Sequence, residues 1–327
     1  MCPSRIQVVL ATYRSERFLE EQLQSILQQQ LLEEWHRSHA TPASAPLQIL
    51  VRDDESTDQT WDLLLQMERN SSGRLLLDRG PRLGIVGNFN ALLTSSDAPY
   101  VALSDADDVW TPYRLHQGMR ALRQAEQKWG TSVPLLVCSD AQLCDERLQI
   151  LHPSFWRHQG LHPDRCTLRH LLVQNIVQGA TVLCNRALLD VALPIPPGAI
   201  LHDWWLGLVA AATGHVIPLR EPLLLYRQHG ANSVGAPPHP LARVLFEGRT
   251  AWKAQQQQQV RTMRQAAALA QRLQQLAAAP EAQDLAAAYG GLLEKSPFNK
   301  ARALIRHRLW RHGVLQKTGQ LTRLLIQ

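Results

Sequence analysis

The sequence has few cysteines and no long apolar run. Only five of its 327 residues are cysteines, and none has the spacing of a zinc knuckle or a redox Cys-x-x-Cys pair. Four of them lie in apolar runs, which favours reduced packing residues and a reducing compartment. No apolar stretch approaches the ~20 residues of a membrane span, and no apolar signal segment precedes the first predicted strand. We therefore expect a cytoplasmic protein that lies at most on the inner surface of the cell membrane.

The composition is that of an ordinary globular protein, with an uneven charge. Hydrophobic residues make up 45% and charged residues 19%. The length of 327 residues is enough for one large domain or two modest ones. The formal net charge is +6. Basic residues concentrate in residues 242–327, whereas the acidic clusters lie before residue 110. A basic tail fits nucleic acid, an anionic membrane or an anionic substrate, so charge alone does not choose among them.

Short apolar runs alternate with segments of helical period over the first 110 residues. The runs predict strands at residues 6–10, 47–51, 75–77 and 100–103, with helices that begin at Ser15, at 55–58 and at Asn88. This alternation predicts an α/β fold with a mostly parallel sheet and flanking helices. Ligands bind such sheets beyond the carboxyl ends of the strands. Polar clusters at residues 11–13, 53–54 and 105–108 each follow a predicted strand, so we expect them to converge on one crevice.

Beyond residue 110 the pattern is mixed and then becomes helical. Helices are predicted at residues 112–127 and 203–212, and extended segments at 135–137, 179–184 and 223–226. A proline-containing loop is expected at residues 33–46. From about residue 241 the chain is rich in Ala, Gln, Arg and Leu. We therefore expect one domain over residues 1–240 and a basic, helical C-terminal extension over residues 241–327.

Three carboxylates, Asp105, Asp107 and Asp108, follow an apolar strand within four positions. They repel one another, and their ionised forms are costly near a buried strand end unless a cation lies among them. A divalent metal is the usual partner, because ions such as Mg²⁺ take oxygen ligands and share them with phosphates. The alternative is an acidic helix start, with Thr111 as the cap and Pro112 in the first turn. Both interpretations fit the motif taken alone.

Several motifs together resemble the family 2 glycosyltransferases of the GT-A (Rossmann-like) fold. They are the segments 8–13 with Glu16, 53–58 and 105–110, followed by 171–175 with 179–181, 202–205 and 226–230. The last three resemble the bacterial rhamnosyltransferase branch. The resemblance covers about residues 5–235. It implies a catalytic domain over residues 1–240, with a nucleotide-binding half at about 1–110 and an acceptor half at about 111–240.

The resemblance also implies roles at the nucleotide side. Ala11 and Tyr13 would frame the base, and Asp54 would accept a hydrogen bond from the base edge. For Asp54 the alternative is a helix cap beside Ser56 and Thr57. Further contacts with the nucleotide sugar are implied for Glu16, Asn88, Arg82 and Asp105, although Glu16 also fits a first-turn acid of its own helix.

For the metal, the resemblance implies Mg²⁺ or Mn²⁺. Asp107 is the implied ligand proper, Asp105 bridges metal and nucleotide, and Asp108 is a weaker candidate or only an acid at a helix start. His229 is an additional candidate ligand of metal or diphosphate, and Arg227 could pair with phosphate. The alternative for His229 is an ordinary surface histidine.

Asp203 is the implied general base of an inverting transfer, which needs a carboxylate to take the proton of the acceptor hydroxyl. The alternative is an N-cap aspartate. His202 stands where the family often has Glu. The adjacent Trp204 and Trp205 cannot both face one core, so one is expected to pack and the other to contact the acceptor.

We therefore expect an inverting, metal-dependent glycosyltransferase of surface-polysaccharide (O-antigen type) synthesis. The expected donor is dTDP-L-rhamnose, and the expected acceptor is a glycan or lipid-linked glycan. The alternatives are a UDP-hexose donor and a non-catalytic protein that binds nucleotide sugars or glycans. Nucleic acid is not expected, because carboxylates at the strand ends repel phosphate. The segment from about residue 296 predicts a basic amphipathic helix that suits an anionic membrane, with packing on the catalytic domain as the alternative.

Overall fold

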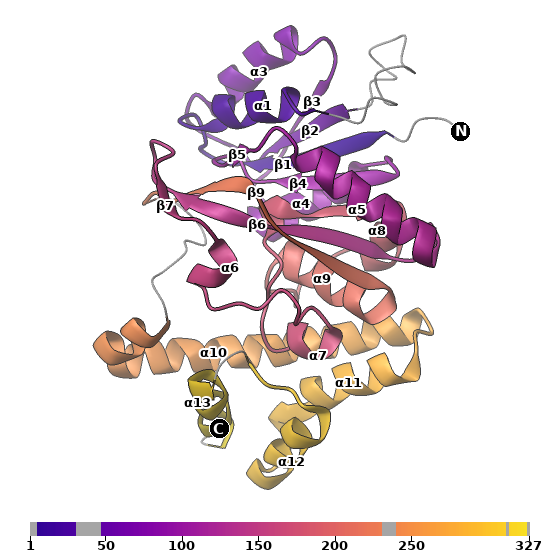
Figure 1. Cartoon of the computed structure of the whole chain (residues 1–327), viewed down its shortest axis with the longest axis vertical. Helices are drawn as coiled ribbons and strands as arrows, with labels where there is room; N and C mark the ends of the chain where they lie inside the picture. Colours follow the sequence, from indigo (N-terminus) through magenta and orange to yellow (C-terminus); the bar gives the residue numbers. More distant parts are fainter. Residues whose placement is uncertain (1–4, 31–46, 231–239, 312–313, 326–327) are drawn as a thin grey trace.

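The computed structural model describes residues 5–30, 47–230, 240–311 and 314–325 (Figure 1). The loop predicted at residues 33–46 and Cys2 lie outside this part of the chain. The strands are β1 (Ile6–Thr12), β2 (Leu47–Asp53), β3 (Leu75–Arg79), β4 (Tyr100–Ser104), β5 (Val109–Trp110), β6 (Leu135–Cys144), β7 (Ile150–His152), β8 (Leu183–Asn185) and β9 (His215–Arg227). The α-helices are α1 (Leu19–Leu27), α3 (Thr60–Asn70), α4 (Gly84–Ser95), α5 (Arg114–Trp129), α6 (Phe155–His158), α7 (Leu168–Leu171), α8 (Arg186–Ala192), α9 (His202–Thr213), α10 (Pro240–Gln275), α11 (Pro280–Gly290), α12 (Pro297–His307) and α13 (Val314–Leu325), with two 3₁₀ turns at Gly179–Thr181 and Gly291–Glu294.

The first four strands form a parallel half-sheet in the order β3-β2-β1-β4, as the alternating pattern predicts. β1 and β4 are buried on both faces, which is typical of central parallel strands covered by helices. Thr12 pairs with Asp53, and Leu10 pairs with Ser104. The strands therefore end together, and the polar residues that follow them emerge at one edge. The predicted α/β fold is confirmed.

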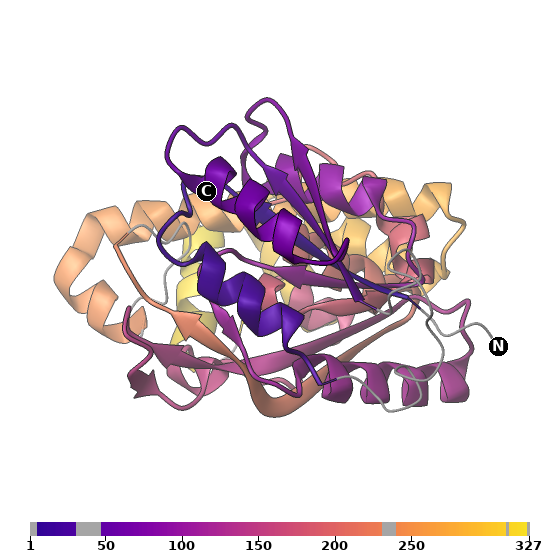
Figure 2. The same ribbon diagram turned by 90° about the horizontal axis from the view of Figure 1, so that it is seen from above.

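The second half of the sheet is mixed rather than parallel. The three-residue strand β8 lies between β4 and β6 and runs antiparallel to both, so β6 again runs in the same direction as β4. β6 and β9 then pair in parallel along most of their length. The short β5 pairs antiparallel with β9, so the segment of the three aspartates is held between β4 and β5. Seen from above, α1 and α3 lie over the parallel half (Figure 2).

The helix starts differ from the sequence predictions. α5 begins at Arg114, after β5, so the acidic cluster does not open a helix and the capping interpretation with Thr111 and Pro112 is wrong. α1 begins at Leu19, and Ser15 supplies only its backbone carbonyl to the amides of Phe18 and Leu19.

α3 begins at Thr60 rather than at residues 55–58, because a local turn replaces the first helical turn. The Asp53 carboxylate accepts hydrogen bonds from the backbone N–H and the hydroxyl of Ser56. Such side-chain bonds to nearby backbone compete with the helix.

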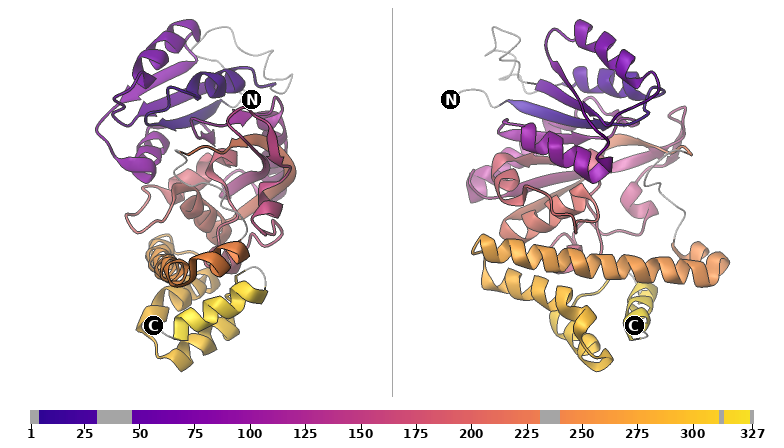
Figure 3. Two further views of the ribbon diagram at one scale, coloured as in Figure 1. Left: turned by 90° about the vertical axis from the view of Figure 1, so that its left-hand side faces the viewer. Right: turned by 180° about the vertical axis from the view of Figure 1, so that it is seen from behind.

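The C-terminal extension is helical, as predicted, and it packs on the sheet domain. The 36-residue α10 runs beneath the sheet across the width of the molecule, with α11, α12 and α13 on its far side (Figure 3). Leu269 and Leu273 of α10 share one buried core with Trp205 of α9. The expected boundary near residue 240 therefore separates two segments of sequence that complete one core. Within the described ranges, no helix has the combined length and apolar character needed to cross a bilayer.

Candidate active site

A single cavity of about 1500 Å³ lies at the carboxyl edge of the parallel strands. It is lined by most of the residues that the sequence singled out, from both halves of the sheet domain: Ala11, Tyr13, Glu16, Asp54, Arg82, Asn88, Asp105, Asp107, Asp203, Trp204 and His229. The expected convergence of the three polar clusters is thus confirmed as a matter of position. Trp205, Asp108 and Arg227 do not line the cavity.

The loop between β4 and β5 turns its three aspartates in different directions. Asp108 is fully buried, and its Oδ1 accepts a hydrogen bond from the backbone N–H of Arg227 at 3.1 Å. Asp107 points into the cavity, where its Oδ2 lies 3.0 Å from Nε2 of His229. Asp105 also lines the cavity. Asp108 is therefore a buried anchor of the loop, and its assignment as an acid at a helix start is wrong.

Burial and mutual repulsion make the carboxyls of Asp105 and Asp108 hard to ionise. Desolvation, with the charges of Asp107 and Asp203, raises the pKa of Asp105 to about 7. Desolvation, with the charges of Asp107 and Asp105, also holds the pKa of Asp108 well above its usual range. The site therefore gains free energy from any cation that approaches it from the cavity.

A buried arginine lies behind the carboxylates, and sequence reasoning missed it. Arg114 donates hydrogen bonds to the carbonyls of Leu103 and Ala180, and its guanidinium lies 3.4 Å from the ring centroid of Trp110. Burial lowers its pKa to about 9, while the charges of Asp108 and Asp105 act in the opposite direction. A signal existed, because position 114 shares the inner face of α5 with Gly118 and Leu122 at helical spacing.

Arg227 has a structural role rather than the expected phosphate contact. It is 1% exposed and pairs with Glu21 at 2.6 Å. It also donates to the carbonyl oxygens of Asp107 and Glu146. The guanidinium thereby ties the aspartate loop to α1, and the predicted phosphate contact is wrong.

The residues present fit a divalent metal that is completed by its substrate. No group of three or more Asp, Glu, His or Cys side chains is preassembled for a metal within the described residues. Mg²⁺ and similar ions in phosphate-transferring sites take only one or two protein carboxylates and obtain further oxygens from phosphates and water. The Asp107 carboxylate beside the His229 imidazole, with Asp105 on the same cavity wall, is a donor set of that kind.

Asp54, which the sequence predicted as a nucleotide contact, is already engaged with the protein. It is 3% exposed, its Oδ1 accepts from Leu83 N and from Arg52, and its Oδ2 accepts from Gly84 N. It therefore does cap a helix, but the helix is α4 and not the one beside Ser56. A carboxylate offers about four acceptor sites, so one remains on Oδ2.

The other predicted nucleotide contacts lie around Asp54. Asn88 is 2% exposed and exchanges two hydrogen bonds with Arg52, so it supports the same corner of the cavity. The Tyr13 ring lies 4.2 Å from the guanidinium of Arg82. Glu16 precedes α1, and its carboxylate accepts a hydrogen bond from the backbone N–H of Gln59 at the start of α3.

Asp203 lies in the first turn of α9 and lines the same cavity. It is 7% exposed, and desolvation raises its pKa to about 7. Hydrogen bonds from Trp204 N, Gly179 N and the Asn175 side chain act in the opposite direction. This carboxyl therefore changes protonation state close to neutral pH. Gly179 is required here, because a Cβ at that position would lie 3.4 Å from Asp203 Oδ2 and 2.9 Å from the neighbouring imidazole.

The neighbouring His202 is a buried, neutral imidazole. Burial lowers its pKa to about 3, and its ring stacks on Phe89 with centroids 3.7 Å apart. Neither ring nitrogen has a hydrogen-bond partner among the described residues. Because it is uncharged, His202 leaves the protonation of Asp203 to be governed by burial and hydrogen bonding.

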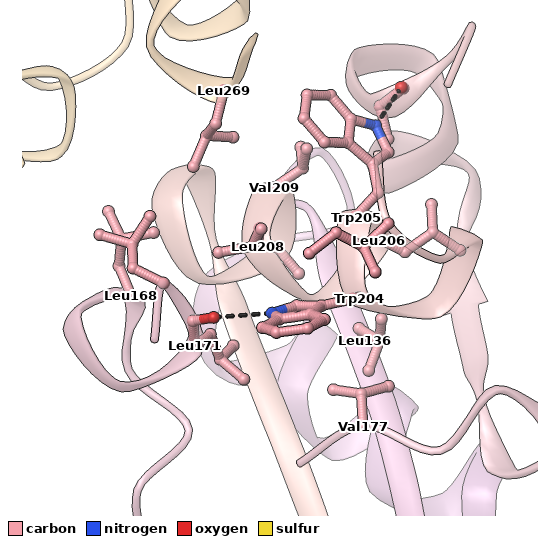
Figure 4. Close-up of a cluster of buried hydrophobic side chains, with 14 of the residues drawn as sticks. Leu136, Leu168, Leu171, Val177, Trp204, Trp205, Leu206, Leu208, Val209 and Leu269 are labelled. Atoms are coloured by element: carbon pink, nitrogen blue, oxygen red, sulfur yellow. Dashed lines mark hydrogen bonds between the residues drawn. The ribbon is translucent and has the colours of Figure 1, made fainter. Parts of the chain in front are cut away.

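The two tryptophans of α9 point to different places (Figure 4). Trp205 is fully buried and donates to the carbonyl of Ala192, so its predicted contact with an acceptor is wrong. Trp204 is 6% exposed, donates to Leu171 O, and still forms part of the cavity wall. The expectation that only one indole faces the cavity therefore matches the structure.

Part of the sequence matches a known protein family, and several relatives are similar to most of the chain. Residues 7–128 match the family model described as glycosyl transferase family 2. An uncharacterised glycosyltransferase of Nostoc is 25% identical over 240 residues, which are 70% of this chain and 66% of the relative. The dTDP-rhamnosyl transferase RfbG of Shigella flexneri is 25% identical over 240 residues, 69% of this chain and 74% of RfbG. An uncharacterised Mycobacterium tuberculosis protein is 24% identical over 227 residues, which are 59% of its length.

Solved structures share the fold at lower identity. TarS of S. aureus (residues 1–349, in complex with UDP-GlcNAc) superposes with a TM-score of 0.52 and 16% identity, covering 93% of this chain and 80% of that one. The mannosyltransferase PcManGT of Pyrobaculum calidifontis, in complex with GDP-Man and Mn²⁺, gives a TM-score of 0.51 and 19% identity, covering 98% and 79%. These likenesses establish the GT-A fold. Residues 7–128 thus resemble the family 2 glycosyltransferases, and the chain as a whole shares the GT-A fold.

Proposed function

We propose that this protein transfers a sugar from a nucleoside diphosphate sugar to a glycan hydroxyl, with inversion at the anomeric carbon. The observation that carries the proposal is that one cavity is lined both by the Asp107–His229 pair and by Asp203. The pair suits a metal-bound diphosphate, and Asp203 offers a proton acceptor. A protein that only binds nucleotide sugars has no use for the second.

On the donor side, the base of the nucleotide lies between Ala11 and Tyr13, with Glu16 and Asn88 nearby. The free acceptor site on Asp54 Oδ2 takes a base N–H. Leu83 N, Gly84 N and Arg52 already orient this carboxylate, so little side-chain entropy is lost on binding.

Asp107 and His229, with Asp105, hold Mg²⁺ or Mn²⁺ in this proposal. When bound there, the ion would supply positive charge to the leaving diphosphate, which would stabilise the transition state more than the ground state. A nitrogen ligand favours Mn²⁺ over Mg²⁺, because Mg²⁺ prefers oxygen ligands throughout. PcManGT, which shares the fold, binds Mn²⁺ together with GDP-Man.

Asp203 acts as the general base. A carboxyl with a pKa of about 7 holds a proton more strongly than an ordinary aspartate, yet it is largely ionised just above neutral pH. It takes the proton of the acceptor hydroxyl as that oxygen attacks the anomeric carbon. Trp204 lies on the same wall and contacts the acceptor sugar.

The donor in this proposal is dTDP-L-rhamnose, and the acceptor is a surface-polysaccharide intermediate or a lipid-linked glycan. RfbG, named as a dTDP-rhamnosyl transferase, supports this choice. UDP-hexoses are the second candidate, since TarS, which shares the fold, binds UDP-GlcNAc.

A donor panel tests the enzyme and its donor together. Purified protein is offered dTDP-L-rhamnose, UDP-hexoses and GDP-mannose with Mn²⁺ or Mg²⁺, and release of the nucleoside diphosphate is measured with and without glycan acceptors. We expect the fastest release with dTDP-L-rhamnose and Mn²⁺. Release from a UDP-hexose alone changes the donor assignment. No release from any donor, with acceptors present, rejects the enzyme.

The exposed face of α12 supports contact with an anionic membrane. Phe298 and Ile305 are 75% and 64% exposed, and Arg302 lies between them at helical spacing. Leu304 on the other face is fully buried, so the helix packs on the protein and still offers an apolar, basic face outward. Co-sedimentation with phosphatidylglycerol vesicles measures this contact. Replacing Phe298 and Ile305 by Ser should abolish it, whereas Leu76→Ser at another exposed apolar position should not. Equal binding to neutral vesicles, or no loss in the double variant, contradicts it.

A further inference from the structure

The cavity continues past Asp203 to a second wall that the C-terminal helices build. Thr262 of α10, Tyr289 of α11 and Gln320 of α13 line it, together with Arg311, which follows α12. The volume of about 1500 Å³ exceeds the roughly 300–1,000 Å³ that is usual for one small-molecule ligand. The helical wall therefore faces space that a donor alone does not fill.

Hydrogen bonds fix the positions of these side chains. The hydroxyls of Tyr289 and Thr262 lie 2.9 Å apart, and Thr262 also donates to the Gln259 carbonyl. Gln320 Oε1 accepts from the backbone N–H of Arg311, and its Nε2 donates to Leu309 O, both at 3.0 Å. The segment that carries Arg311 is therefore clamped against α13.

The charge on this wall lacks a counter-ion. Among the described residues no carboxylate pairs with Arg311, and its Nε is buried without a hydrogen-bond partner. Arg323, 4% exposed, donates to the side-chain oxygens of Gln255 and Gln259. Its pKa falls to about 10 because of burial and the charge of Arg311. Residues 296–327 contain seven Lys or Arg and no Asp or Glu.

Arg323 is buried and the neighbouring Arg311 is half-buried, and two such cations cost free energy unless a ligand supplies an anion. A guanidinium presents paired N–H donors that match a phosphate or a carboxylate. A neutral glycan would leave the Arg311 charge uncompensated.

We propose that Arg311 and the helical wall bind an anionic group of the acceptor, either a phosphate or a sugar carboxylate. This inference rests on the proposed glycosyltransferase function and specifies its acceptor. An acceptor held at Arg311 by its anionic group lies in the same cavity as Asp203, so one of its hydroxyls can reach the base.

The test measures binding of simple probes while saturating nucleoside diphosphate and Mn²⁺ occupy the donor side. Glucose 1-phosphate, glucuronate and methyl glucoside are titrated into the wild type, Arg311→Gln and Arg264→Gln. Arg264 is an exposed arginine of α10 outside the cavity wall, which makes it the matched control. We expect at least one anionic probe to bind the wild type at least tenfold more tightly than methyl glucoside. Arg311→Gln should remove that advantage, and Arg264→Gln should keep it.

Tighter binding of glucose 1-phosphate indicates a phosphate-bearing acceptor, and tighter binding of glucuronate indicates an acidic sugar. Equal binding of all three probes, or unchanged binding in Arg311→Gln, overturns the proposal. Nucleotide binding is measured separately, so a failure of the donor site is seen independently of the Arg311 result.

Folding of the variant is checked by thermal unfolding without ligand. Arg311→Gln removes a charge that has no counter-ion, so its Tm should not fall below that of the wild type. If it does not fold, Arg311→Lys takes its place. Lys keeps the charge but loses the paired donors, and we expect anion binding at least threefold weaker. Unchanged binding in that variant contradicts the proposal.

Discussion

The two walls of the cavity carry opposite charges and are compensated differently. At the strand edge, Asp105 and Asp107 stand in front of two buried arginines, Arg114 and Arg227, which hold the loop from behind. At the helical wall, Arg311 has no carboxylate behind it among the described residues. The negative charge of the wall at the strand edge (the strand-edge wall) is thus partly neutralised before any ligand binds. The positive charge of the helical wall is not. A cation suits the first wall and an anion the second, in agreement with the proposed metal-bound donor and the proposed anionic acceptor.

The largest expected effect tests whether Asp203 is the general base of the cavity. Asp203→Asn keeps the size and an acceptor oxygen of the side chain but cannot take a proton, so kcat should fall by about 10²–10⁴-fold. Binding of nucleoside diphosphate with Mn²⁺ should stay as in the wild type. The wild-type rate should rise with pH and level off above about 7, where Asp203 is ionised.

Steady-state kinetics over a pH series measures this effect, with the exposed Asp190→Asn as the control. A wild-type kcat in Asp203→Asn would show that Asp203 is not the general base. A fall in nucleotide binding would instead indicate that Asp203 contributes to donor binding.

The same substitution should stabilise the protein, in a pH-dependent way. The pKa of Asp203 is about 7 when folded and 3.8 in its ordinary state, so ionisation opposes folding. The wild type therefore loses stability as the pH rises from about 4 to about 7, and Asn does not. At about 1.4 kcal/mol per pH unit, the free energy of unfolding should differ by up to about 4 kcal/mol above pH 7.

Denaturant unfolding at pH 4.5, 6 and 8 measures this difference. It should widen between the first two pH values, widen further by the third and stay level above that. A constant difference would mean that the carboxyl is hydrated rather than buried between the walls.

A smaller effect tests the cation preference of the strand-edge wall. Asp107→Ala and His229→Ala should weaken Mn²⁺-dependent binding of nucleoside diphosphate by about 10–100-fold, the range found even for groups that only support a metal ligand. Glu20→Ala, an exposed acid of α1, should leave it unchanged. In His229→Ala the preference for Mn²⁺ over Mg²⁺ should shrink, because the nitrogen ligand is gone. Calorimetric titration with each metal, and with EDTA, measures this. Tight binding of nucleoside diphosphate without metal in all three variants would contradict a cation site at the strand-edge wall.

Local sequence patterns predicted the parallel half of the fold and the position of the site. Apolar runs followed by polar clusters located Asp54, Asp105 and Asp107, because side chains at the ends of parallel strands must meet at one edge. Asp203 and His229 came from the family resemblance, and their roles stay predictions.

What the sequence did not predict depends on contacts between distant segments. The two-residue β5 forms only because β9 lies beside it, and its presence removed the helix start at Thr111. The burial of Arg227 and Trp205 is likewise set by other elements, and so is the place of Arg311 in the cavity wall. No local periodicity carries that information.

The hydrogen bond from Ile200 N to Gln265 Oε1 has a consequence for how the chain unfolds. It joins the segment just before Asp203 to α10 at 2.7 Å, over 65 positions of sequence. Because α10 and α9 also share one buried core, neither can open without exposing the apolar surface of the other. The extension and the sheet domain should therefore melt in one cooperative transition, and a chain cut at residue 240 should also lose the folded structure around α9.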